Sequence, residues 1–226
     1  MKSIRFIVLF VFLGSFKVFS QDISRVTSGI DLGLGYQDKV WVPSATYHQE
    51  LSLTNFPWFR IGWGVRAWGY YAGRTDMLPK TSAVNADTLK FGKISANGAS
   101  FLLGANFRLW KFDIGANTDL FGVAFGLKRN ALYGGGKLYD KGGEFYNSYL
   151  KSAPATFNVL PLVMDKQNGQ SEAYVRFWIT DRIGLKVAYV HGRVTYASPV
   201  KLMNGQTRYS TTYGVPYLAL SFPLYN

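Results

Sequence analysis

The chain contains only two histidines, and one of them lies near residues with which it could do chemistry. His191 precedes Thr195 and Ser198. A histidine acting as a general base can activate such a hydroxyl group for attack on an ester bond of a lipid. No nucleophile motif accompanies these residues, so we assign no catalytic residue and predict that the protein is not an enzyme. A lipid A-modifying enzyme is kept as the second alternative function.

The other histidine, His48, stands two positions before Glu50, so the two side chains would share one face of a strand. Two ligands do not make a metal site of the zinc type. The glycines of "GLGYQD" and "YGGGK" lack the spacing and the strand-to-helix context of a phosphate-binding loop. The absence of cysteine excludes thiolate catalysis, disulfide bonds and lipid anchors attached to cysteine. The sequence therefore predicts no metal and no cofactor.

Single charged residues recur at alternate positions of segments that are otherwise apolar or glycine-rich. Successive side chains of a strand point to opposite faces, so these charges would share the inner face of a closed sheet. The two signs are close to balanced, and an unpaired buried charge would cost several kcal/mol, so we expect pairing. A narrow path for ions or small solutes is the first alternative function. The predicted interior polar network, structural in role, comprises Glu50, Arg60, Arg66, Arg108, Asp113, Asp119, Glu172, Arg176 and Lys186, with Asp31 and His48 beside them.

Eight segments show the alternation that such faces require. The clearest is "FRIGWGVRAWGYY", residues 59–71, in which large apolar residues alternate with glycine and arginine. No later run reaches the roughly 18 apolar residues of a transmembrane helix. We predict an all-β protein, an eight-stranded antiparallel up-and-down transmembrane β-barrel. Its strands are expected at residues 29–36, 44–54, 59–71, 101–109, 112–126, 172–180, 183–192 and 214–222.

The apolar positions switch from odd to even numbers across Trp110 and Lys111. In a two-residue hairpin turn, Leu109 and Phe112 stand opposite each other and must share a face. One number is odd and the other is even, so the switch is what this turn requires. Trp-Lys is a poor turn sequence in water, but tryptophan is favoured at the headgroup level of a membrane.

Two further details of register follow from the same counting. Across a three-residue loop at 180–182, Ile179 would oppose Ile183, and the apolar residues do stay at odd positions. Between Asp119 and Phe121 the apolar residues return from even to odd positions. A bulge near Leu120 would explain that return.

Short and long connections alternate along the chain. The short ones are residues 55–57, 110–111 and 180–182, and the long ones are 37–43, 72–99, 127–171 and 193–213. Outer-membrane barrels have short periplasmic turns and longer extracellular loops. Residues 128–151 carry five Lys or Arg and four Tyr, which suits recognition of a glycan, a lipopolysaccharide or a protein partner. A solvated loop with no single ligand is the alternative.

A soluble barrel of the lipocalin kind would turn its apolar face inward. Bulky residues such as Trp63, Phe107 and Phe177 would overfill an eight-stranded interior, whereas lipid sets no such limit. The opposite face is mostly glycine with single charges and lacks the dense Lys and Glu of a water-facing surface. The sequence thus favours a membrane barrel. Its interfacial aromatic girdle, at the short turns, would comprise Phe56, Trp58, Trp110, Trp178, Phe222 and Tyr225.

The N-terminus has the pattern of a secretory signal peptide. Lys2 and Arg5 precede the apolar run "FIVLFVFL", and "VFS" ends in a small residue suited to cleavage. We predict a signal peptide at 1–20 and a barrel domain at 21–226. Removing three basic residues and no acidic one leaves 22 basic against 13 acidic residues, a net charge of +9. Acidic lipid headgroups and lipopolysaccharide phosphates, not nucleic acid, are the expected counter-charges.

On this architecture and the "FSQ" end of the signal segment, the chain resembles the small eight-stranded outer-membrane β-barrel proteins of Gram-negative bacteria, most closely the Bacteroidota-type family. The resemblance implies an outer-membrane location and insertion by the barrel-insertion machinery, with "YLALSF" as the terminal-strand signal. The trailing "PLYN" departs from members that end on the aromatic residue. We expect a non-enzymatic monomer with a side-chain-filled interior. Its long loops would act in structural, surface-binding or assembly-accessory roles, toward outer-membrane lipids, lipopolysaccharide, or an extracellular glycan or protein ligand.

Overall fold

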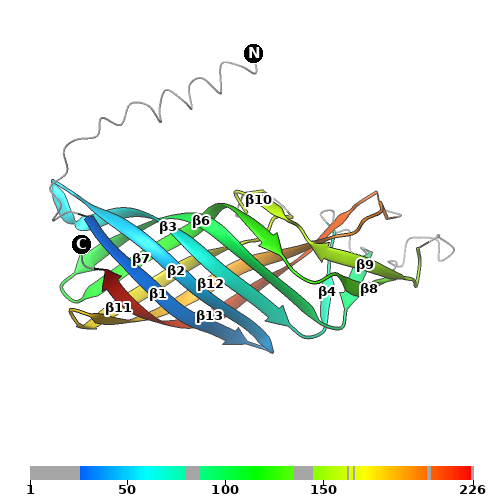
Figure 1. Cartoon of the computed structure of the whole chain (residues 1–226), viewed down its shortest axis with the longest axis horizontal. Coiled ribbons are helices and arrows are strands. Elements are labelled where there is room, and N and C mark those ends of the chain that lie inside the picture. Colours follow the sequence, from blue (N-terminus) through cyan, green and yellow to red (C-terminus); the bar gives the residue numbers. More distant parts are fainter. Residues whose placement is uncertain are drawn as a thin grey trace, which may run out of the picture.

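The computed structural model describes residues 26–79, 87–134, 145–161, 163–164, 166–202 and 205–224. The predicted signal peptide and Tyr225 lie outside these ranges. No helix among the described residues is long and apolar enough to cross a membrane. Eight long strands form an antiparallel barrel (Figure 1): β1 (Val26–Gln37), β2 (Val40–Leu53), β3 (Phe56–Ala72), β6 (Ile94–Leu109), β7 (Phe112–Phe125), β11 (Gly169–Thr180), β12 (Ile183–Ala197) and β13 (Arg208–Leu224).

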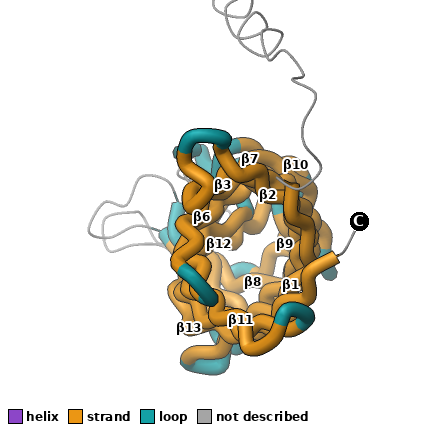
Figure 2. The backbone as a smooth tube through the Cα atoms, turned by 90° about the vertical axis from the view of Figure 1, so that its left-hand side faces the viewer, coloured by secondary structure: helices purple, strands orange, loops and turns teal. Residues whose placement is uncertain are grey.

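The barrel closes because its first and last strands pair. β1 pairs with β13 from Ser28↔Leu224 to Gly35↔Tyr217, and every other long strand pairs with its neighbours along the chain. Seen along the axis, the strands make a ring (Figure 2). A closed ring leaves no unpaired strand edge, which a lipid environment requires. The predicted eight-stranded up-and-down barrel is confirmed.

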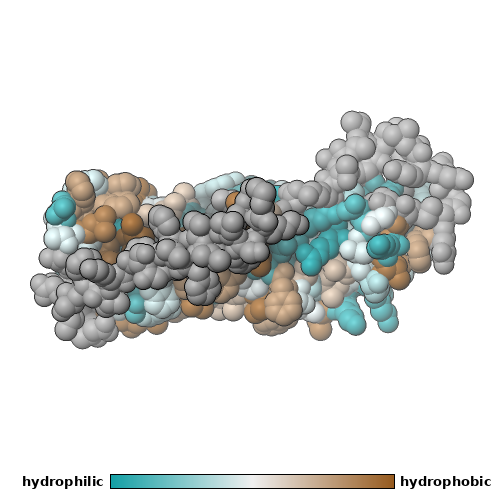
Figure 3. All heavy atoms as spheres, turned by 90° about the horizontal axis from the view of Figure 1, so that it is seen from above, coloured by the Kyte–Doolittle hydropathy of each residue, from teal (hydrophilic) through white to brown (hydrophobic). Residues whose placement is uncertain are grey.

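The two faces of the barrel differ as the alternation predicts. Val187 and Leu218, which pair across β12 and β13 on the outer surface, are 56% and 54% exposed. The residues next to them in sequence, Lys186 and Ala219, are buried inside. Figure 3 shows apolar residues (brown) along the strand surface and hydrophilic residues (teal) gathered toward the half that carries the long loops. The apolar belt therefore faces outward.

The turn at Trp110 and the bulge at Leu120 agree with the sequence. Leu109 pairs with Phe112 across a two-residue turn in which Trp110 has a left-handed φ of 57°. Further along the same hairpin the ladder shifts, because Phe101 pairs with Phe121 and Leu102 with Asp119. Leu120 is thus the extra residue of the bulge.

Three of the predicted connections were wrong. The β2–β3 connection is a two-residue turn at 54–55 and not residues 55–57, because Leu53 pairs with Phe56. Residues 37–43 are not a long linker, because Asp38 and Lys39 form a two-residue turn with φ of 50° and 67°, and both strands run up to it. The left-handed geometry matches the turn type that suits the twist of a hairpin. The β11–β12 turn is also two residues long, with Thr180 paired to Ile183 and a register shift at Ile179. Because of that shift, the outward apolar residues stay at odd positions on both strands, which a three-residue loop would also give.

Several strands are longer than predicted at the end with the long loops. Past His191, β12 continues to Ala197, and its even-numbered, inward positions there carry the large apolar residues Val194 and Tyr196, both buried. The apolar face of the strand thus changes from outside to inside where the strand leaves the belt. The predicted strand ended at residue 192 because the prediction followed only apolar residues on the outer face.

The long loops contain a second, small sheet, here called the long-loop lobe. It consists of β4 (Thr75–Met77), β5 (Thr88–Phe91), β8 (Arg129–Gly134) and β9 (Tyr149–Pro154). Buried Met77, Phe91 and Tyr133 form its core with tyrosines of β12 and β13. β10 (Phe157–Val159) pairs instead with β7 and continues the barrel wall past β11, toward the long-loop end. The lobe is joined to the barrel through one apolar core.

We predict that Val187→Arg lowers the free energy of unfolding by about 2–4 kcal/mol in lipid vesicles, since it places a charge midway along the belt. Ile183→Arg, on the same face beside the short turn, should cost at most about 1 kcal/mol. Denaturant unfolding followed by tryptophan fluorescence measures both values. Equal costs for the two variants would contradict an outward lipid-facing belt.

Candidate functional site

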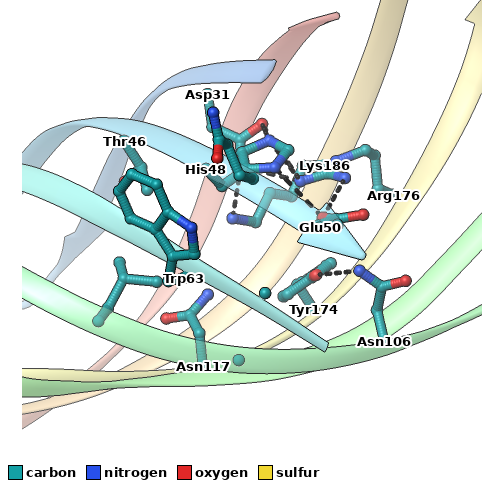
Figure 4. A pocket seen from close by; sticks show the side chains of 14 residues that line it. Asp31, Thr46, His48, Glu50, Trp63, Asn106, Asn117, Tyr174, Arg176 and Lys186 are labelled. Atoms are coloured by element: carbon teal, nitrogen blue, oxygen red, sulfur yellow. Dashed lines mark hydrogen bonds and ion pairs between the residues drawn. The ribbon is translucent and has the colours of Figure 1, made fainter. Parts of the chain in front are cut away.

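Two ion-pair clusters lie in the barrel interior, a lower one nearer the short turns and an upper one nearer the long loops. Arg176, from β11, is the centre of the lower cluster (Figure 4). Its guanidinium lies 3.1 Å from Asp31 and 3.4 Å from both Glu50 and Asp113. Its Nε donates a hydrogen bond to Ser221 Oγ at 3.1 Å. The partners come from β1, β2, β7 and β13, so this one side chain ties strands on several sides of the barrel.

Arg66, from β3, is the centre of the upper cluster. It lies 3.0 Å from Asp119 and 3.1 Å from Glu172, and it donates a further hydrogen bond to Asn117. Asp119 also accepts a hydrogen bond of 2.9 Å from the Gln170 backbone N–H. Asp119 and Glu172 are therefore each held by a donor from another strand, and Asp119 is held by donors from two strands.

Lys186 connects the two clusters. Its Nζ lies 2.9 Å from Asp31 in the lower cluster and 2.5 Å from Glu172 in the upper one. His48 adds contacts in the lower cluster, 3.2 Å from Glu50 and 3.6 Å from Asp31. The result is one continuous network of paired charges across the interior.

The structure places the predicted network residues together, with one at the margin. Arg60 is buried and lies 3.5 Å from Glu50. The side chain of Arg108 is 35% exposed, and its Nε lies 3.7 Å from Asp113, so it borders the network at the short-turn end. Five basic side chains stand among five carboxylates: Arg60, Arg66, Arg108, Arg176 and Lys186 among Asp31, Glu50, Asp113, Asp119 and Glu172.

Aromatic residues that were not predicted for the interior network complete the interior. Tyr174 lies beneath both cations of the lower cluster, 4.5 Å from Lys186 Nζ and 5.3 Å from Arg176 Cζ to the ring centroid. Above the charges, buried Tyr70 and Tyr213 pack with ring centroids 4.7 Å apart. Their inward parity was visible in the sequence, but apolar residues had been assigned to the outer face.

A small polar cavity lies beside the network (Figure 4). Thr46, His48, Asn106 and Tyr174 line it, and about 30 Å³ is open to the centres of water molecules. Because one water needs roughly 10–15 Å³ of such space, the cavity has room for about two waters. Side chains fill the interior around it.

The predicted aromatic girdle lies at the short-turn end, with one correction. Phe56, Trp58 and Trp110 are exposed there, and Phe222 is half-buried on β13. Trp178 instead turns inward, and its Nε1 donates a hydrogen bond of 2.7 Å to Asp113. It has the parity of Arg176, and an indole N–H near the interior needs an acceptor. Trp178 therefore closes the lower end of the network.

The histidine–hydroxyl pair of the enzyme alternative does not form. His191 is exposed on the outer face, whereas Thr195 and Ser198 are both buried, and Ser198 Oγ accepts a hydrogen bond from the Val200 N–H at 3.4 Å. The direct cross-strand neighbour of His191 is Ser171. Among the described residues, no group of three or more His, Cys, Asp or Glu could hold a metal ion.

An outward apolar belt, a closed ring of strands and an interior of paired charges define a membrane-spanning eight-stranded β-barrel. Among solved structures, the chain is similar to Neisserial surface protein A (NspA), with 10% identity, coverage of 87% of this chain and 94% of that chain, and a TM-score of 0.35. It is also similar to Ail, the attachment invasion locus protein of Yersinia pestis, crystallised with the heparin analogue sucrose octasulfate, with 12% identity, coverage of 88% and 97%, and a TM-score of 0.32. No family model matches the chain, and no curated protein does.

We predict that Arg176→Met destabilises the protein by about 3–5 kcal/mol, because it leaves three buried carboxylates without their shared partner. The matched variant Arg108→Met removes a partly exposed pair and should cost at most about 1 kcal/mol. Reversible unfolding in detergent or vesicles gives both values. If Arg176→Met costs no more than Arg108→Met, the interior network does not hold the barrel together.

Proposed function

We propose that the protein is a non-conducting outer-membrane barrel that holds the long-loop lobe outside the cell, where the lobe binds anionic glycans. The observation that carries this proposal is the lobe itself, an ordered cationic sheet built on the extended ends of barrel strands. Barrel residues Tyr196 and Tyr209 pack in its core, so its surface has a fixed shape. A preformed surface loses little conformational entropy when it binds.

The charge of the long loops supports an anionic ligand. Their described residues, 73–79, 87–93, 126–134, 145–161, 163–164, 166–168, 198–202 and 205–207, include eight Lys or Arg and two Asp. Of the two carboxylates, Asp87 is buried, and its Oδ2 accepts a hydrogen bond from the Tyr133 hydroxyl. Exposed cations include Lys90 in β5 and Lys201 between β12 and β13. Such a surface attracts polyanions and repels cations.

The filled interior argues against the channel alternative. Arg66 and Arg176 are almost completely buried between their carboxylate partners, and Trp68, Tyr70 and Tyr213 fill the barrel above them. An ion passing through would have to displace paired charges from a space that is barely wider than the side chains. The enzyme alternative lacks support, because exposed His191 and the buried hydroxyl groups of Thr195 and Ser198 do not form a pair.

The outer-membrane location and the export route belong to the same proposal. A closed β-barrel with an aromatic end and one long-loop end suits insertion from the periplasm, with the long loops outside. The strand "YLALSF" lies within β13, the strand that closes the barrel, where an insertion signal would be read. Membership of the Bacteroidota-type family and a monomeric state are expectations of the resemblance.

We predict that the purified protein gives no current steps in planar lipid bilayers, because paired charges close the interior. Tyr70→Ala/Tyr213→Ala, which removes aromatic rings above the network, should also stay silent, since the network below them is intact. Single-channel recording tests both. Stable conductance steps from the unmodified protein would contradict the proposed non-conducting barrel.

We predict that Lys90→Gln/Lys201→Gln weakens binding to immobilised heparin, used as a polyanionic probe, by about ten-fold. Lys111→Gln/Arg182→Gln removes the same charge at the short turns and should leave binding unchanged. Surface plasmon resonance in detergent at physiological ionic strength measures the affinities. An equal loss in both variants, or no binding by the unmodified protein, would contradict glycan binding by the lobe.

A further inference from the structure

A groove of about 960 Å³ crosses the outer face of the barrel at the long-loop end. The strands beneath it, β2, β3, β6 and β7, are neighbours in the sheet (Figure 1). Trp41 pairs with Tyr71, Tyr71 pairs with Ser95, and Asn97 pairs with Phe125. Residues from four strands thus form one continuous surface just above the belt.

The floor of this groove is aromatic and apolar. Trp41, Tyr71, Phe125 and Leu127 line it, and all four are exposed. The Tyr71 hydroxyl donates a hydrogen bond of 2.6 Å to Asn97 Oδ1, which fixes the ring. Phe125 has the same outward phase as the exposed apolar residues lower on β7. The floor is therefore continuous with the surface that acyl chains cover.

Three cations border the same groove. Lys39 is on the β1–β2 turn, Lys93 directly precedes β6, and Arg129 begins β8. Arg129 Nη2 donates a hydrogen bond of 3.4 Å to Ser95 Oγ, while its buried Nε has no hydrogen-bond partner in the described part of the chain. None of the residues that line the groove is a carboxylate. Its positive charge is not neutralised from within.

We propose that this groove binds a phosphorylated, multiply acylated glycolipid of the outer leaflet. The aromatic floor takes acyl chains, and Lys39, Lys93 and Arg129 take the phosphate groups in charge-assisted hydrogen bonds. Phosphatidylethanolamine has no net negative charge to satisfy three cations. A soluble polyanion has no acyl chain to cover the floor. The inference rests on the proposed outer-membrane location but not on glycan binding by the lobe.

Binding at this groove would also strengthen the junction between barrel and lobe. Ser95 belongs to barrel strand β6, and Arg129 is the first residue of lobe strand β8. A phosphate held by Arg129 and Lys93 joins the two elements at their point of contact. A ligand that binds only the folded junction stabilises it by mass action.

The test is native mass spectrometry of the full mature chain in detergent, titrated with diphosphoryl lipid A. The unmodified protein should retain this lipid at least ten-fold more tightly than phosphatidylethanolamine. Lys39→Gln/Lys93→Gln should lower lipid A affinity about ten-fold or more. Lys90→Gln/Lys201→Gln removes the same charge from lobe strand β5 and the β12–β13 loop, outside the groove, and should change lipid A affinity less than two-fold.

A steric variant tests the groove without changing its charge. Gly73 lines the groove, and a Cβ built on it would meet nothing within 4 Å, so the backbone accepts a side chain there and Gly73→Phe adds a bulky ring at the groove. It should lower lipid A affinity and leave heparin binding unchanged. Heat-modifiable migration on a detergent gel verifies that each variant is folded.

Each outcome decides the proposal. Loss of lipid A affinity in the groove variants, with heparin binding retained, supports it. Equal losses in the groove and lobe variants, no preference for lipid A over phosphatidylethanolamine, or unchanged affinity in Gly73→Phe would overturn it. Failure of heparin binding alone would remove the proposed lobe function and leave the groove intact.

Discussion

The structure depends on charge compensation inside a barrel too narrow to hydrate its charges freely. An eight-stranded interior is just wide enough for side chains to fill, so Arg66, Arg176 and Lys186 must find carboxylates and not bulk water. Glycine on the inner face makes the space for them. At Gly62 a Cβ would lie 2.5 Å from the Gln49 carbonyl oxygen and 3.1 Å from Glu50 Cγ, so no larger residue fits beside the network.

Because paired side chains occupy the interior, function moves to the surfaces of the barrel. Strands β12 and β13 continue past the belt, where their apolar residues turn inward and support the lobe. On β2, β3 and β7, by contrast, aromatic residues stay on the outer face up to the long-loop end, where they form the floor of the groove. The lobe thus rests on apolar residues that turn inward, whereas the groove continues the outward apolar face of the belt.

Inside the belt the sequence was sufficient to predict strand positions, the two faces and most of the network, because each strand there contacts lipid on one side and charge on the other. It failed where that contrast is lost. The lobe pairs distant residues, such as Phe91 with Ala131, and no local alternation indicates such pairing. Trp178 was assigned to the girdle by residue type, although its parity matched Arg176. The enzyme alternative rested on sequence proximity, but His191 and Ser198 lie in different environments.

The bulge at Leu120 shows how these requirements are met at one residue. Asp119 must point inward to reach Arg66, and Phe121 must point outward to meet lipid, yet two positions of a regular strand share a face. Adjacent pairing of Leu102 with Asp119 and Phe101 with Phe121 leaves Leu120 outside the ladder. Its freed carbonyl oxygen accepts a hydrogen bond of 2.5 Å from the Leu160 N–H, in the segment that follows β10. The irregularity that preserves both faces therefore also attaches a long loop to the barrel wall.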